Sequence, residues 1–313
     1  MPLDMVLNEL SLTPAPDIFM ARCRMSRLVQ TIKAAKLTGV KGSLRTQAGL
    51  QLITLAEGYA FSRWAYDREV SQDERLFVVR LVTKEPYLQD YPSLEDKAAR
   101  AECLFDGIAA RGLLAAYLLD TLALSLASEP CWDVCRLQVK YQEITEGLEL
   151  TSADEWVYHA SSPDHIGRNA TWIQERLLRD VRTGGELWTR RDELFPSLDF
   201  CGSTQSQAET LTPEMLPFVL KHLTALENYC RSWSDGGFDP NAVRLQVSPE
   251  SEATLNQYGD ERTIICPDNM TRQFSWHSKI GRHAWRIYFA PTNNPGHLVI
   301  GYIGPHLHIS SGT

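Results

Sequence analysis

The residues best suited to chemistry stand close together near the end of the chain, in the stretch FSWHSKIGRHAWRIYF (274–289). Within it, His277 can take up or release a proton near neutral pH, and Lys279 and Arg286 can hold the oxygens of a phosphate group. RNA is cut without a metal when a base removes the 2′-hydroxyl proton, a cation stabilises the phosphorane and an acid protonates the leaving oxygen. The stretch contains groups for all three steps, and the ring of Tyr288 could stack on an unpaired base.

Strand periodicity should gather these side chains on one surface. We expect two strands here, because polar and apolar residues alternate in both halves of the stretch. His277 and Lys279 then share one face of the first strand, and Arg286 and Tyr288 share one face of the second. The apolar residues expected on the opposite faces, packed on a helix, are Phe274, Trp276 and Ile280 of the first strand and Trp285, Ile287 and Phe289 of the second.

Two histidines follow the last expected strand and are candidates for the same surface. His306 and His308 form the motif HLH, and we expect them to close the surface beside His277. Histidines at positions i and i+2 of an extended chain can also bind a metal, so a metal-dependent nuclease built on these three histidines is an alternative. No Asp or Glu follows Asp268, and we therefore expect no metal ligand and no cofactor.

Each of these residues also has a purely structural interpretation. A histidine on a strand, such as His277, is often only hydrogen-bonded, and Lys279 and Arg286 can simply solvate a sheet face. The sequence contains no P-loop, dinucleotide-binding glycine pattern, nucleophile elbow or paired-cysteine zinc array.

The charge of the chain is unevenly distributed. The formal net charge is −8, which argues against a protein that coats nucleic acid along its whole surface. From Arg262 to the end, however, the net charge is +4, and five of the eight histidines lie there. The rest of the chain therefore carries −12, and such an acidic part could cover a cationic site in the same chain.

Four strands are expected to position the candidate residues. They cover 262–267, 272–280, 284–291 and 297–304, and the turn-like segments between them have the length of hairpin connections. We predict a four-stranded antiparallel meander, packed on a helix at 213–234 whose apolar residues recur every three or four positions.

This order of elements resembles the RelE/ParE-type bacterial toxin superfamily over the last third of the chain, chiefly in the motifs WRIYF and IGYIGPHL. By that resemblance, Lys279, Arg286, Tyr302 and His306 match the region where such toxins keep RNA-cleaving groups, and Arg272 and Arg282 are expected to bind RNA. The toxins are usually small separate chains, whereas here a long segment precedes the similar part. Members of the ParE-like branch are not known to cut RNA, so the fold alone does not determine activity.

The preceding segment is expected to combine helices with an antiparallel sheet. We predict a strand at 6–12, helices at 17–36 and from Ser71 to Pro86, and consecutive strands at 115–128, 133–145 and 155–161. Helices at 162–185 and 185–196 should follow. The overall class is therefore α+β, with an N-terminal domain over 1–190 and a RelE-like domain over 191–313.

The composition points to the cytoplasm. The seven cysteines are scattered, as expected of free thiols in a reducing compartment, and no apolar segment is long enough for a membrane span. We expect a toxin-like or antiviral defence effector that binds RNA or the ribosome and acts as a metal-independent endoribonuclease. The alternative is a non-catalytic subunit of a defence or regulatory complex. Either could have a protein partner, such as an antitoxin or another subunit.

Overall fold

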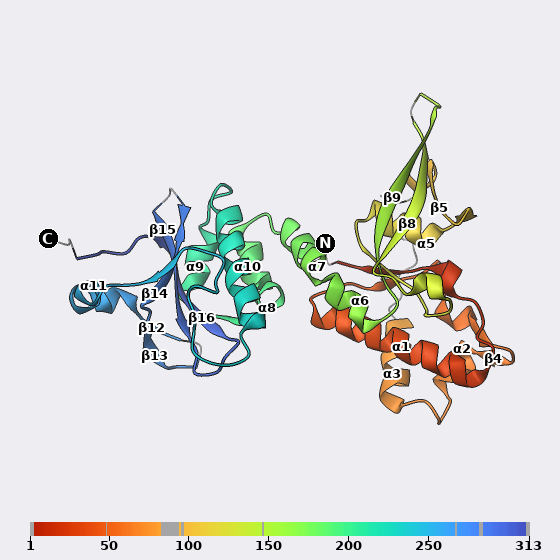
Figure 1. Cartoon of the computed structure of the whole chain (residues 1–313), viewed down its shortest axis with the longest axis horizontal. Coiled ribbons are helices and arrows are strands. Elements are labelled where there is room, and N and C mark those ends of the chain that lie inside the picture. Colours follow the sequence, from red (N-terminus) through yellow and green to blue (C-terminus); the bar gives the residue numbers. More distant parts are fainter. Residues whose placement is uncertain are drawn as a thin grey trace. The chain divides into compact units, whose positions relative to one another are not determined.

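A computed structural model describes residues 3–47, 49–82, 94, 97–145, 147–266, 268–281 and 284–310 (Figure 1). Contacts within the chain separate two units, Met1–Leu177 and Leu178–Thr313. The sequence places the boundary at residue 190, inside helix α8 (Gly184–Leu194). In the structure α8 lies wholly in the second unit, because it packs closely on α9 (Thr204–Glu209).

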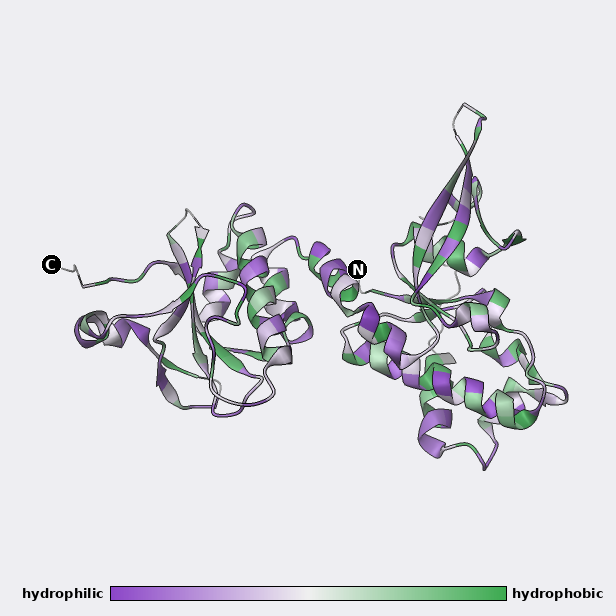
Figure 2. Cartoon of the chain, viewed as in Figure 1, coloured by the Kyte–Doolittle hydropathy of each residue, from purple (hydrophilic) through white to green (hydrophobic). Residues whose placement is uncertain are grey.

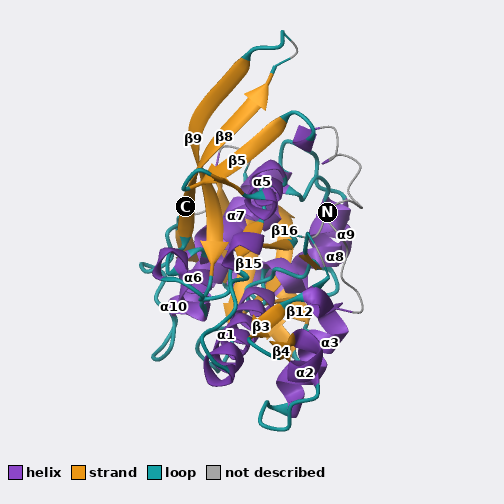
Figure 3. Cartoon of the chain, turned by 90° about the vertical axis from the view of Figure 1, so that its right-hand side faces the viewer, coloured by secondary structure: helices purple, strands orange, loops and turns teal. Residues whose placement is uncertain are grey.

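The first unit is built on a seven-stranded mixed sheet in the order β2-β1-β7-β9-β8-β5-β6. The pairs β2–β1, β1–β7 and β7–β9 are parallel, and the pairs β9–β8, β8–β5 and β5–β6 are antiparallel. The predicted antiparallel sheet is therefore only one half of the observed sheet. Figure 3 shows β5, β8 and β9 side by side, and the β8–β9 hairpin extends away from the helices of this unit. The strands are β1 Met5–Leu7, β2 Leu44–Arg45, β5 Ala101–Phe105, β6 Ile108–Ala109, β7 Leu122–Leu124, β8 Arg136–Ile144 and β9 Leu150–Ala160, besides a separate pair, β3 Thr54–Ala56 and β4 Tyr59–Ala60.

The predicted helix at 17–36 is confirmed as α1 (Ile18–Leu37), which begins at its cap Asp17. Its hydrophobic and hydrophilic residues alternate in blocks (Figure 2), as expected of a helix that buries one side. The helix predicted from Ser71 is confirmed as α3 as far as Val82, and its predicted end at Pro86 lies outside the described residues. The other helices of this region are α2 Phe61–Ala65, α5 Arg111–Leu118, α6 Pro163–Arg168 and α7 Ala170–Arg179.

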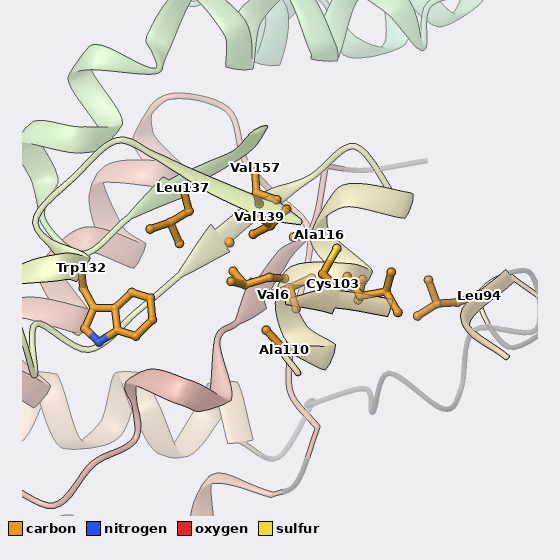
Figure 4. Packing of buried hydrophobic residues seen from close by; sticks show 13 residues of the cluster. Val6, Leu94, Cys103, Ala110, Ala116, Trp132, Leu137, Val139 and Val157 are labelled. Atoms are coloured by element: carbon orange, nitrogen blue, oxygen red, sulfur yellow. The ribbon is translucent and has the colours of Figure 1, made fainter. Parts of the chain in front are cut away.

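Three predictions for this region are wrong in detail. The strand predicted at 6–12 ends at Leu7, because Asn8 caps a short 3-10 helix over Glu9–Ser11. The segment 115–128 is not one strand, because the end of α5 and the short strand β7 share it. Both elements contribute to the core, where Figure 4 shows Ala116 of α5. The periodicity of a buried apolar run does not distinguish a helix from a strand. The segment 162–185 is not one helix, because α6 ends before Asn169, whose side-chain amide donates to the carbonyls of His159 and Cys135.

The second unit contains a five-stranded sheet in the order β10-β16-β15-β14-β11, in which only β10 and β16 are parallel. The predicted four-stranded meander is therefore wrong in part. The segment 272–280 breaks at Phe274 and Ser275, so that its first part pairs with 263–265 in a separate small sheet. The strands are β10 Leu198–Phe200, β11 Val247–Pro249, β14 Trp276–Ile280, β15 Trp285–Pro291 and β16 Leu298–Pro305, and the small sheet consists of β12 Thr263–Ile265 and β13 Thr271–Gln273.

Helix α10 (Leu216–Ser232) covers one face of the larger sheet, as predicted. Nδ1 of His222 on this helix lies 2.6 Å from the hydroxyl of Ser278, and the ring of Phe238 contacts Trp276 and Phe289 on the same side. Phe274 does not share the face of Trp276, because it packs with Tyr288 on the other side of the sheet. Helix α11 (Glu252–Tyr258) precedes the small sheet.

Candidate functional site

The sheet face opposite α10 carries the polar residues that the sequence places together. In the pairing of β14 with β15, His277 lies opposite Tyr288 and Lys279 lies opposite Arg286. Ser278, between the two, points to α10. The two cross-strand pairs are therefore neighbours on one face, roughly 7 Å apart along the strands.

The two ends of this face differ in burial. His277 is 4% exposed and Tyr288 is fully buried, whereas Lys279 and Arg286 are each half-buried. Burial lowers the pKa of Arg286, whose guanidinium also donates to the carbonyl of Trp285 at 2.8 Å. The Lys279–Arg286 end is therefore the part of the face that solvent can reach.

A buried ion pair covers the His277 end. Nη2 of the fully buried Arg262 lies 3.1 Å from Oε1 of Glu250, and Arg262 also donates to the carbonyl of His308 at 2.8 Å. The Tyr288 hydroxyl donates to the same carboxylate oxygen at 2.8 Å. Burial alone would raise the pKa of Glu250, but Tyr288, Arg262 and His277 together lower it, so the buried carboxylate stays ionised.

His277 faces this carboxylate with an unsatisfied ring nitrogen. Its Nε2 lies 3.2 Å from the hydroxyl of Ser248, and its Nδ1 lies 3.4 Å from Oε1 of Glu250 in a geometry that is not a hydrogen bond. Burial lowers the pKa of His277 to about 4, although the charge of Glu250 opposes the shift. The imidazole is therefore neutral at pH 7.

His306 brings a second imidazole to the same place. The backbone N–H of His306 donates to the carbonyl of Ala284, which continues the strand pairing, and its ring centroid lies 5.8 Å from that of His277. One ligand-capable atom from each of Glu250, His277 and His306 lies within 4.8 Å of the others. His308, expected beside them, instead contacts Glu261 at 2.8 Å and is exposed.

The remaining predicted site residues lie in different surroundings. Tyr302 is opposite Tyr288, half-buried, and donates to the carbonyl of Pro305, so it borders the cluster. Burial raises the pKa of Tyr302, and burial with the Glu250 contact raises that of Tyr288. A fully buried Tyr288 offers no ring face to a base, contrary to the stacking role expected from the sequence.

Of the other two arginines expected to bind RNA, the structure describes only Arg272, which does not join the cluster. Arg272 lies on β13 and makes two hydrogen bonds, of 2.7 and 2.5 Å, with Asp268. Arg282 lies outside the described residues.

Three residues of the cluster were missed from the sequence. Glu250, Arg262 and Ser248 precede the candidate stretch, and Glu250 looks like part of a helix start. Glu250 reaches His277 because β11 pairs with β14. The strand-like segment VSP (247–249) before Glu250 is the feature of the sequence that could have indicated this pairing.

The first unit contains a second polar cluster, at the carboxyl ends of its parallel strands. Nε2 of His159 lies 2.8 Å from the hydroxyl of Ser125, which also accepts from the amide of Asn8, and Nδ1 of His159 lies 2.8 Å from the carbonyl of Val134. A serine beside an oriented imidazole can act as a nucleophile. Here all three side chains are fully buried, and burial lowers the pKa of His159 to about 4. The cluster therefore connects strands rather than meeting a substrate.

No family model, curated protein or solved structure matches this chain. Among the described residues, no helix combines the length and the apolar character that crossing a membrane requires. The geometry of the second unit is therefore the basis for a functional interpretation.

Proposed function

We propose that the second unit is a RelE-like domain that binds RNA at the Lys279–Arg286 end of the sheet face and cleaves it without a metal. The observation that supports this most is the cross-strand pairing of two cations beside two imidazoles, all on the face opposite α10. Such a face can hold a phosphate and exchange protons with it.

The different burial of the two cations and the two imidazoles suggests a different role in the reaction for each. Arg286 and Lys279, which are half-buried, hold the phosphate, and Arg286 does so with a planar fork. His306, also half-buried, removes the proton from the 2′-hydroxyl. His277 is too buried to touch RNA, so it is a positioning residue that contacts His306.

The proposed reaction is a transesterification. The 2′-oxygen forms a bond to phosphorus, the bond from phosphorus to the 5′-oxygen breaks, and the ammonium of Lys279 protonates the leaving oxygen. The products are a 2′,3′-cyclic phosphate and a 5′-hydroxyl end. Tyr302 lines the border of the site and positions the segment before His306 through its bond to Pro305.

The charge distribution suggests how a cell would restrain such an activity. The part of the chain before Arg262 carries −12 and the part from Arg262 onward carries +4. Within the proposal, the acidic part or a partner protein competes with RNA for the cations, as in a toxin or defence effector.

The test is RNA cleavage by the purified full chain in the presence of a chelator. We expect products with cyclic phosphate ends, and at least a tenfold slower reaction for His306→Ala and Arg286→Ala. Lys221→Ala is the matched control, because Lys221 is an exposed cation on α10. Cleavage that survives both site substitutions would refute the assignment.

The second candidate is a non-catalytic interaction subunit. The complete burial of Tyr288 and Arg262 favours this candidate, because a polar network that solvent cannot reach can have a purely structural role. The cleavage assay distinguishes the two candidates. If the full chain binds RNA or a partner protein but leaves RNA intact at the same protein concentrations, the result supports this candidate over the first.

A further inference from the structure

Each imidazole of the cluster uses one ring nitrogen in a hydrogen bond, which leaves the other nitrogen as a candidate metal ligand. Nδ1 of His306 lies 2.6 Å from the carbonyl oxygen of Leu307, which can only accept, so Nδ1 carries the proton and Nε2 has the lone pair. In His277 the nitrogen without a hydrogen bond is Nδ1, and it faces Glu250. A 95% buried side chain thus directs an unsatisfied nitrogen at a carboxylate.

We propose that Glu250, His277 and His306 bind a divalent transition-metal ion such as Zn²⁺. Their ligand-capable atoms lie within 4.8 Å of one another. A zinc ion holds nitrogen and oxygen ligands at about 2.0–2.2 Å, so the three groups need to draw together by about 1 Å to share one. His306 can make that adjustment, because it is half-buried and follows the last strand.

The surrounding contacts support the same assignment. Histidines that bind metals usually donate their other ring N–H to a carbonyl or another oxygen, and the carboxylate ligand is itself hydrogen-bonded. Here Leu307 and Ser248 contact the outer nitrogens of the two imidazoles. Tyr288 and Arg262 donate to Glu250.

The ligand types indicate which ions fit. Two imidazoles and one carboxylate favour Zn²⁺, Co²⁺ or Ni²⁺ over Mg²⁺ or Ca²⁺, which prefer oxygen ligands alone. A fourth position stays open for water, as in zinc sites with three protein ligands. The positive charge of Arg262 beside Glu250 opposes the ion, so it weakens binding relative to a carboxylate without such a neighbour.

Metal binding would also regulate the proposed reaction. A bound ion occupies the lone pair that His306 needs to accept a proton, so the ion inhibits metal-free cleavage. This consequence rests on the proposed function, whereas the binding itself does not.

The experiment titrates the chelator-treated full chain with Zn²⁺ alone in a calorimeter, and with Co²⁺ while the absorption spectrum is recorded. We expect one ion bound per chain, and Co²⁺ bands without the near-ultraviolet thiolate band that a cysteine ligand produces. His306→Ala should weaken binding at least tenfold. His308→Ala should leave it unchanged, because His308 contacts Glu261 instead.

Glu250→Gln is the second variant, and its far-ultraviolet circular dichroism is recorded first because Glu250 is buried beside Arg262. Binding that His306→Ala leaves unchanged, or the absence of binding, overturns the metal site. If Zn²⁺ binds but RNA stays intact in chelator, the metal site stands and the proposed function fails. If RNA is cleaved in chelator and the Zn²⁺ titration shows no binding, the metal site fails and the proposed function stands.

Discussion

Nδ1 of His277 lies 3.4 Å from Oε1 of Glu250, and both side chains are 5% exposed. The same carboxylate oxygen accepts hydrogen bonds from Tyr288 and Arg262. Two strands, β14 and β15, thus meet the segment before α11 and the residue before the small sheet at one oxygen atom. We expect the stability of the second unit to depend on the hydrogen bonds that this oxygen accepts, because a buried carboxylate without partners is costly.

Replacing Arg262 by Met should destabilise the second unit by about 3–5 kcal/mol, because the change leaves the buried carboxylate of Glu250 without its cation. Urea denaturation of the full chain, followed by tryptophan fluorescence, measures the effect. Adding Glu250→Gln to the same chain should recover part of the loss. The matched control is Arg272→Met, whose partner Asp268 is exposed, and which should cost about 0–1 kcal/mol. Equal losses of unfolding free energy for the two substitutions would contradict the conclusion that Arg262 compensates a buried charge.

Replacing Tyr288 by Phe should cost about 1.5–3 kcal/mol, because the hydroxyl donates to a charged, buried acceptor. Tyr302→Phe removes a hydroxyl that donates to a neutral backbone carbonyl instead, and should cost about 0.5–1.5 kcal/mol. The measurement is the same denaturation experiment. The order of the two costs is the decisive result, and a larger loss for Tyr302→Phe would count against a buried network centred on Glu250.

Stability should fall as the pH is lowered from about 6.5 toward 4. Burial lowers the pKa of His159, His222 and His277 to about 4 each, whereas the pKa in the unfolded chain is about 6.5. The unfolded state therefore binds more protons in this window, and the stabilisation present above pH 6.5 is lost as the pH falls. The midpoint of urea denaturation at several pH values measures the slope.

A histidine variant distinguishes the contribution of these imidazoles to the pH dependence from that of the carboxylates, which titrate at lower pH. His222→Gln removes one of these three imidazoles and should flatten the slope between pH 6.5 and 4. His308→Gln changes an exposed imidazole and serves as the control. An unchanged slope for His222→Gln would show that the imidazole of His222 titrates in the folded protein as it does in the unfolded one.

Lys279→Ala and Arg286→Ala should each weaken RNA binding, most at low salt. If each cation neutralises one phosphate of a single strand, its removal reduces the slope of log K against log salt by about 0.7. Fluorescence anisotropy with a labelled oligonucleotide at several salt concentrations measures this slope. Lys221→Ala, on the opposite side of the sheet, should leave it unchanged, and an equal effect of all three substitutions would indicate unspecific charge attraction.

Local periodicity was enough to predict which side chains of β14 and β15 share a face. His277 and Lys279 alternate with Trp276 and Ile280, and a strand sends successive side chains to opposite sides regardless of its neighbours. The helix cap at Asp17 was predictable for the same reason, because its carboxylate accepts a hydrogen bond from the N–H of Met20, only three residues along the chain. Where a segment was apolar throughout, as at 115–128, periodicity could not distinguish the end of α5 from the strand β7.

The sequence by itself determined the cationic end of the chain, the two alternating strands and the helix that covers them, since each depends on residues a few positions apart. Only the tertiary structure decided that Glu250 and Arg262 close over His277, that Tyr288 is buried and that His308 lies apart from His306. The physical reason is that pairing between distant strands and burial depend on how the whole chain packs. Burial therefore keeps the imidazole of His277 neutral, and one carboxylate brought in from a distant segment determines which group its Nδ1 faces.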